Sequence, residues 1–204
     1  MRHALFLIAF ALLLTILGGC QSTGVPAYSS NGLSDNDVNR ILDQAEAAAK
    51  AQPSLLRVNA QGQPQTCRMH IMVLNRTGHT VGRRSMEDAW HGSVSIAVSK
   101  AYTAMAFSSN ENALSTRSIG ALSQPGGPLW NIGNSNRGAF EPGLIEFPGG
   151  LPLYKDGKLV GGIGVSGDGV DQDESVAAAG AAGFEPPESI RIDTVSKSAL
   201  PYKK

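Results

Sequence analysis

The chain has 204 residues, of which 42% are hydrophobic and 17% are charged. This length suits one ordinary domain with a substantial core. Seventeen basic and seventeen acidic residues cancel, so no strong field of one sign is available to attract nucleic acid or an anionic membrane surface. We therefore expect no nucleic-acid partner.

The first segment is typical of an exported lipoprotein. Residues 4–17 are almost wholly apolar and are followed by Leu17-Gly18-Gly19-Cys20, which looks like a bacterial lipobox. The apolar run is shorter than the ~20 residues that a transmembrane helix needs. We expect a signal peptide over residues 1–19 and a lipid on Cys20, with an ordinary cleaved signal peptide as the alternative. Gln21, rather than Asp, follows Cys20, so a host with two membranes is expected to sort the chain to its outer membrane, facing the periplasm.

A flexible tether is expected over residues 20–33, which are mostly polar and rich in Gly and Ser. If Cys20 carries a lipid, Cys67 is left alone and forms no internal disulfide. Cys67 opens an apolar run, which predicts a buried and inert thiol. An exposed, reactive or intermolecular thiol is the alternative.

A folded domain is expected over residues 34–183, beginning with a helix at Ser34. Asp37 follows three residues later, as in a helix-capping pair, and Pro53 sets the limit of the helix. The helical face is apolar at positions Val38, Ile41, Leu42, Ala45 and Ala49. Residues 53–65 are polar and are expected to form an exposed loop.

The middle of the chain predicts strands over 68–75 and 80–84, joined by a turn at 76–78. Residues 93–107 fit both a strand and a helix pattern, but their length and alanine content favour a helix. A shorter helix over 112–122 and a strand over 143–147 complete this part.

Residues 148–183 read as strand, turn, strand, glycine loop and helix. Apolar runs at 151–154 and 159–165 flank Asp156-Gly157, a strong hairpin signal. The loop Ser166-Gly167-Asp168-Gly169 then leads to a helix start, where Asp171 and Glu174 have the spacing of a capping pair, and Gly183 is the expected stop. Residues 184–204 are expected to form a peripheral tail.

These elements predict an α+β domain in which an antiparallel sheet of about five strands is covered by helices. Gly162-x-Gly164-x-x-Gly167 matches the dinucleotide-binding fingerprint letter for letter. The preceding strand belongs to a hairpin, however, and too little chain follows to build a parallel nucleotide-binding domain. We interpret these glycines as sites of close packing, with a small-molecule pocket against the loop as the alternative.

Other polar residues give weaker signals. His70, His79 and His91 lack the short spacing of metal ligands, so surface or hydrogen-bonded roles are expected for them. Ser166 lacks the second glycine of a nucleophile elbow. Aromatic residues that fit either a core or the flat walls of a porphyrin site are Trp90, Tyr102, Trp130 and Tyr154.

Charged residues near the glycine loop have two interpretations. Asp168, Asp173 and Glu174 are expected to cap the following helix, with a metal or acid–base role as the alternative. Lys100 and Thr103 share one helical face at i, i+3 spacing. That spacing fits either a shared pocket or a solvated position for Lys100.

Three stretches resemble the GlcG/HbpS family, also known as the haem-degrading or PduO C-terminal domain family. They are MEDAWHGSVSIAVSKAYTA at 86–104, LSQPGGPL at 122–129 and PGGLPLYKDGKLVGGIGVSGDGVDQDE at 148–174. The resemblance implies a profilin-like layered fold, assembly into a homo-oligomer and binding of haem. Together with the export signal, the resemblance implies a lipoprotein-type member of the family.

The leading hypothesis is a lipid-anchored domain that binds haem or a related small molecule in haem, iron or redox sensing. His91 lies in a matched stretch and has the chemistry of an axial ligand, although the resemblance transfers no iron ligand. Candidate ligand-binding residues are His91, Lys100, Thr103, Gly149, Gly150, Ser166, Gly167 and Asp168.

Two further hypotheses come from other classes. One is an enzyme that degrades haem or acts on a small metabolite, which the family label suggests but which the sequence supports with no acid–base pair or metal cluster. The other is an oligomeric regulatory lipoprotein of the envelope without a ligand, which informs a membrane sensor protein.

Overall fold

The computed structural model describes residues 32–134, 142–196 and 199–204. Cys20, the expected signal peptide and most of the expected tether lie outside the described residues. Among the helices that are described, none has the length and apolar character needed to cross a membrane.

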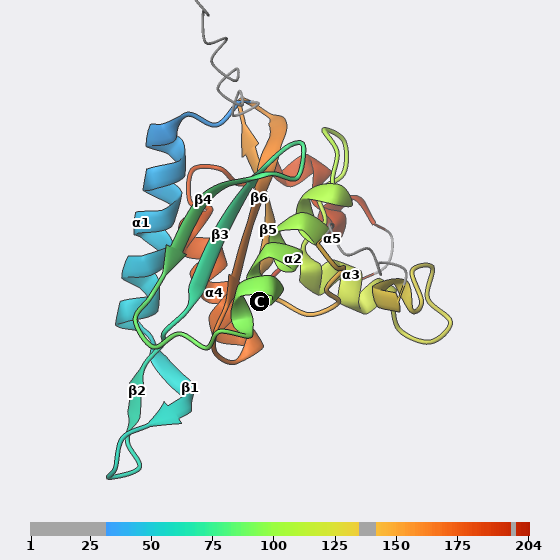
Figure 1. The fold of residues 1–204 in the computed structure, drawn as a ribbon. Coiled ribbons are helices and arrows are strands. Elements are labelled where there is room, and N and C mark those ends of the chain that lie inside the picture. The colour runs from blue at the N-terminus through green and yellow to red at the C-terminus, as the bar shows by residue number, and fades with distance from the viewer. Residues whose placement is uncertain (1–31, 135–141, 197–198) are drawn as a thin grey trace, which may run out of the picture.

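A four-stranded antiparallel sheet in the order β4-β3-β6-β5 forms the centre of the fold (Figure 1). The β5–β6 hairpin turns at Asp156 and Gly157, with φ of 52° and 74°. The predicted hairpin and the α+β class with an antiparallel sheet are therefore confirmed. The strands are β3 (His70–Asn75), β4 (Thr80–Ser85), β5 (Gly150–Lys155) and β6 (Lys158–Ser166).

Helices cover both faces of this sheet. α1 (Asp35–Ala51) and α4 (Val170–Gly180) pack on one face and contact each other, and α2 (Ser93–Ala106) packs on the other (Figure 1). α3 (Thr116–Leu122) lies beside α2 and β5. Shorter helical segments are η1 (Ile132–Asn134), η2 (Glu188–Ile190) and α5 (Ile192–Val195).

The alternation of side chains along β3 shows why two helical layers form. Ile71 and Val73 belong to the core under α1 and α4, whereas Met72 and Leu74 pack against α2. A strand buried on both faces is apolar throughout. The predicted strand over 68–75 is thus confirmed as the buried centre of the sheet, from His70 onward.

Glycines of β6 let α2 approach the sheet closely. A Cβ atom at Gly164 would overlap the Ala97 carbonyl oxygen, and one at Gly162 would overlap the Ala101 carbonyl oxygen. The dinucleotide-like glycine pattern therefore serves close packing, as expected from the hairpin context.

The start of α1 has the predicted capping box. Asp37 N donates to Ser34 Oγ at 3.2 Å, and Ser34 N donates to Asp37 Oδ2 at 2.9 Å. The expected tether reached residue 33, but Leu33 is fully buried in the core. Ordered packing therefore begins before the capping residue.

The predicted loop over 53–65 is wrong. This segment contains β1 (Pro53–Val58) and the start of β2 (Pro64–Thr66), which pair as a separate two-stranded ribbon that projects from one end of the domain (Figure 1). We call this ribbon, residues 53–66, the arm. Side-chain anchors from Asp168, far along the chain, fix its base.

The predicted strand over 143–147 is also wrong, because its backbone bonds to a side chain rather than to a neighbouring strand. Ile145 N donates to Thr103 Oγ1 at 2.9 Å, and the segment lies irregularly along α2. The predicted helix over 112–122 begins only at Thr116, because Ala113 pairs with the chain around Arg191.

The end of the domain differs from expectation in two respects. α4 begins at Val170 after Gly169, which provides no side-chain cap, so the predicted capping by Asp171 and Glu174 is wrong. Residues 184–204 are not simply peripheral, since Phe184 and Tyr202 are 1% and 4% exposed.

Candidate functional site

Lys100 lies at the centre of the candidate residues that the structure brings together. Its Nζ atom donates to Asp173 Oδ2 at 2.6 Å and to the Val165 carbonyl oxygen at 3.0 Å. The Phe147 ring covers the ammonium group, with its centroid 5.0 Å from Nζ. Lys100 is fully buried, so its interpretation as a solvated residue is wrong.

The two charges of this pair are strongly desolvated. Burial lowers the pKa of Lys100, and the Asp173 carboxylate opposes that shift. Burial raises the pKa of Asp173, and the Lys100 ammonium opposes it. A buried pair of this kind depends on the mutual contact of its members, because either charge alone would be costly.

The segment before β5 packs closely around Lys100. Three candidate residues take part in this packing: Thr103, Gly149 and Gly150. Gly149 has φ of 116°, and a Cβ atom there would lie 2.7 Å from Lys100 Nζ. Gly150 N donates to Thr116 Oγ1 at 2.9 Å. Thr103 Oγ1 accepts from Ile145 N and donates to the Ser99 carbonyl oxygen at 2.7 Å. These candidate residues are therefore buried together with their hydrogen-bonding groups engaged.

The loop after β6 anchors the arm. Asp168 Oδ1 accepts from Leu55 N at 2.8 Å, and Oδ2 accepts from Ser54 Oγ. Asp168 N in turn donates to Asp173 Oδ1 at 3.1 Å. Ser166 and Gly167 are buried just before it, and Gly167 approaches the backbone of Arg68 and Met69. Asp168 thus connects the arm to the buried Lys100 pair.

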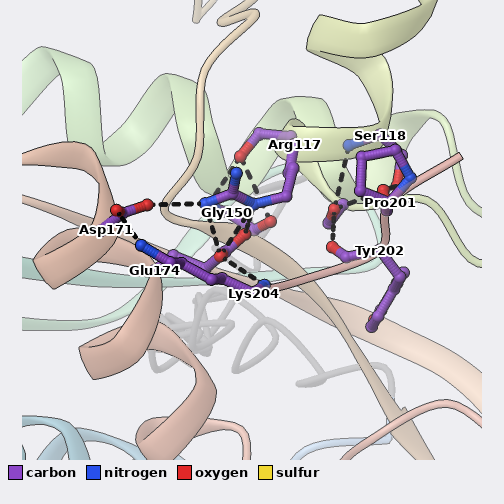
Figure 2. Close-up of polar contacts among 10 residues, drawn as sticks. Arg117, Ser118, Gly150, Asp171, Glu174, Pro201, Tyr202 and Lys204 are labelled. Carbon is purple, nitrogen blue, oxygen red and sulfur yellow. Dashed lines mark hydrogen bonds and ion pairs between the residues drawn. The ribbon is translucent and has the colours of Figure 1, made fainter.

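Arg117 is a residue that the sequence analysis did not single out. Its Nε atom lies 2.9 Å from both carboxylate oxygens of Glu174, and its Nη2 atom lies 2.9 Å from Asp171 Oδ1 (Figure 2). Lys204 binds the same two carboxylates. The acidic residues at the start of α4 gave no signal for this partner, because the helix dipole alone stabilises negative charge there.

His91 lies apart from the buried group, at the start of α2. It is exposed, and the neighbouring Trp90 side chain is 43% exposed. The Arg57 guanidinium from the arm stacks over the Trp90 ring at 4.4 Å, and its Nη2 atom donates to the Asp88 carbonyl oxygen at 2.7 Å. The arm therefore brings a cation to the indole beside His91.

Apolar side chains extend this exposed region. Leu55 is 64% exposed and its Cδ1 atom lies beside Gly169, next to Val170, which is 42% exposed. We call the group Leu55, Arg57, Trp90, His91 and Val170 the arm surface. It combines an imidazole, an aromatic ring, a guanidinium and aliphatic groups on one end of the domain.

His70 fixes the backbone of this region. Its Nδ1 atom lies 2.9 Å from Ser85 Oγ, and Nε2 lies 3.1 Å from the Trp90 carbonyl oxygen. Burial lowers the pKa of His70, which favours the neutral ring at pH 7. The hydrogen-bonded role expected for His70 is confirmed. Through its contact with the Trp90 carbonyl oxygen, His70 helps to fix the backbone that carries the Trp90 side chain.

Cys67 is fully buried, as predicted, and burial raises the pKa of its thiol to about 12, which disfavours the reactive thiolate. Within residues 32–134, 142–196 and 199–204, no group of three or more His, Cys, Asp or Glu side chains is placed to hold a metal ion.

Comparison with known proteins identifies a family whose model spans the domain. The family model described as "Haem degrading protein HbpS-like" matches residues 33–182. An uncharacterized 15.0 kDa protein from the dhaT-dhaS intergenic region of Citrobacter freundii is 34% identical over 105 residues, which are 52% of this chain and 68% of that protein.

Two further relatives bear on ligands. The corrinoid adenosyltransferase PduO of Salmonella typhimurium is 35% identical over 92 residues, which are 45% of this chain but only 25% of PduO. The crystal structure of a PduOC:heme complex superposes with a TM-score of 0.60 and 26% identity, covering 74% of this chain and 94% of that one.

Proposed function

Because the chain belongs to the HbpS-like family, we propose that it binds haem or a related flat tetrapyrrole at the arm surface. The observation that carries this proposal is the exposed Trp90–His91 pair at the start of α2, within the part of the chain that matches the family. The similarity to a domain solved with haem supports the same ligand class.

The groups of the arm surface fit a haem. His91 offers a nitrogen ligand for iron, and Trp90 offers a flat wall for the porphyrin ring. Arg57 offers a guanidinium for a propionate carboxylate. A bound haem would supply a redox-active iron, which suits a role in haem, iron or redox sensing.

The buried candidate residues have a supporting role in this proposal. Lys100 and Asp173 hold the glycine loop, and Asp168 holds the arm on that loop. The proposed ligand-contacting residue among the sequence candidates is therefore His91. The others fix the shape of the surface around it.

Titrations with haemin and with iron-free protoporphyrin IX test the proposal. We expect saturable one-to-one binding of haemin, and weaker binding of protoporphyrin because the imidazole then has no iron to bind. Trp90→Ala should weaken both, whereas Trp130→Ala, which removes another exposed indole, should weaken neither. Absence of saturation with haemin would overturn the proposal.

Haem degradation is the second candidate function, because the family description itself names it. Its test is loss of the Soret band under a reductant and oxygen, with catalase present to remove free peroxide. Degradation that requires His91 but not His79 would favour the enzyme. Stable bound haem under the same conditions would favour binding alone.

We further propose that a lipid on Cys20 anchors the domain to the cell envelope, at the periplasmic side of the outer membrane in a host with two membranes. The lipobox supports this placement. Cys20→Ser should release the protein from the membrane fraction. A homo-oligomer and a membrane sensor partner remain part of the proposal, tested by native mass spectrometry and by cross-linking in membranes.

A further inference from the structure

Residues 199–204 lie against α3 and α4 and bond to both helices (Figure 2), and we call the surface that they cover the groove. We call this segment, with the sequence ALPYKK, the strap. It lies beyond residue 182, where the match to the family ends. The strap is thus an addition to the family domain, and the contacts that hold it involve both its backbone and its side chains.

Two serines at the start of α3, the N-cap Ser115 and Ser118 of the first turn, bind consecutive carbonyl groups of the strap. Ser118 Oγ donates to the Pro201 carbonyl oxygen at 2.7 Å, and Ser115 Oγ donates to the Tyr202 carbonyl oxygen. Hydrogen bonds to backbone carbonyls recognise an extended peptide whatever its side chains are. These serines therefore fix the register of the strap.

Tyr202 provides the anchor for recognition. Its side chain is 4% exposed and belongs to the same core cluster as Leu151 and Ala181. The Arg191 guanidinium lies 5.1 Å from the centroid of its ring. A buried aromatic side chain next to an arginine is the kind of contact that dominates binding in protein interfaces.

Lys204 completes the charge balance of the groove. Its backbone N donates to Glu174 Oε2 at 2.9 Å, and its Nζ atom lies 2.6 Å from Asp171 Oδ2. Arg117 contributes one positive charge against these two carboxylates. The lysine of the strap supplies the second, so without the strap the cluster of Arg117, Asp171 and Glu174 would carry a net charge of about −1.

We propose that this groove is a peptide-binding site, which the strap occupies in cis. We define the strap groove by Ser115, Arg117, Ser118, Asp171, Glu174 and Arg191. Its ligand class is a short extended segment with proline and an aromatic residue followed by two lysines. The strap of a second copy of this chain has that chemistry and can take the same place.

The test uses the full chain and a labelled ALPYKK peptide. The variant Tyr202→Ala/Lys204→Ala removes the two side chains that bind the strap to the groove, so its groove should be free to bind the peptide saturably. The wild-type chain should bind the peptide at least about tenfold more weakly, because its own strap competes for the groove. The buried Tyr202 side chain, which the variant lacks, supplies this difference in binding free energy. A peptide with alanine in place of tyrosine should fail to bind, and adding Ser118→Ala should weaken binding of ALPYKK.

A second measurement on the wild-type chain does not depend on a destabilised variant. Excess ALPYKK should speed hydrogen exchange at the amides of the Tyr202–Lys204 region while leaving exchange in β3 unchanged. Equal peptide binding by wild type and variant would overturn the proposal. Unchanged strap exchange at high peptide concentration, together with no binding to the variant, would overturn it as well.

Discussion

The Lys100 ammonium lies 2.6 Å from Asp173 Oδ2, and the two side chains are 0% and 3% exposed. This pair joins α2 to α4, which cover opposite faces of the sheet, at the point where β6 ends and β5 begins. The candidate residues around Lys100 are therefore a structural connection between two helical layers.

Removing one member of this pair should be far more costly than replacing both. Lys100→Met and Asp173→Leu should each lower the free energy of unfolding by about 3–5 kcal/mol, because each leaves a buried charge without its partner. The double variant should lose much less than the sum of the two. Urea unfolding followed by circular dichroism measures all four proteins.

If the double variant loses as much free energy of unfolding as the two single variants together, the result would contradict a direct coupling between these side chains. Losses below about 1 kcal/mol in both single variants would show that the pair is solvated rather than buried.

Because α2 and β6 are in close contact, we predict that the stability of the domain is sensitive to substitution of Gly164. Gly164→Ala should destabilise the domain by about 3 kcal/mol or more, because the added methyl group would overlap the Ala97 carbonyl oxygen. Gly92→Ala is the control, since nothing lies within 4 Å of a Cβ atom there and its φ is −60°. Thermal unfolding should separate the two variants, and equal melting temperatures would contradict this packing.

The anchoring of the arm by Asp168 predicts a local effect. Asp168→Ala should speed hydrogen exchange in β1 and weaken haem binding, because Ser54 and Leu55 lose the carboxylate that holds them. Asp156→Asn, at the exposed β5–β6 turn, should change neither. Unchanged exchange of the arm in Asp168→Ala would show that other contacts fix it.

Local signals in the sequence predicted the elements whose determinants are close in the chain. Ser34 and Asp37 cap α1 as expected, and Asp156-Gly157 forms the predicted turn. The β6 glycines were assigned to packing because the strand before them belongs to a hairpin. For the helix cap and the turn, the residues that decide the structure lie within a few positions of one another.

Long-range pairing explains what sequence reasoning missed. The arm carries no regular alternation, and its base is held by Asp168, more than a hundred positions away. Arg117 binds Asp171 across 54 positions. Lys100 looked like a solvated helix residue because its partner Asp173 comes from another layer. Sequence patterns within one element carry no information on such partners.

The most direct test of the account compares the Soret bands of haemin-loaded wild type, His91→Ala and His79→Ala. Both histidines are exposed, but only His91 lies on the arm surface. We predict one haem per chain and the same Soret position for wild type and His79→Ala, with a shifted band and at least about tenfold weaker binding for His91→Ala. Identical spectra and affinities in all three proteins, or no saturable binding in any of them, would contradict haem binding at the arm surface.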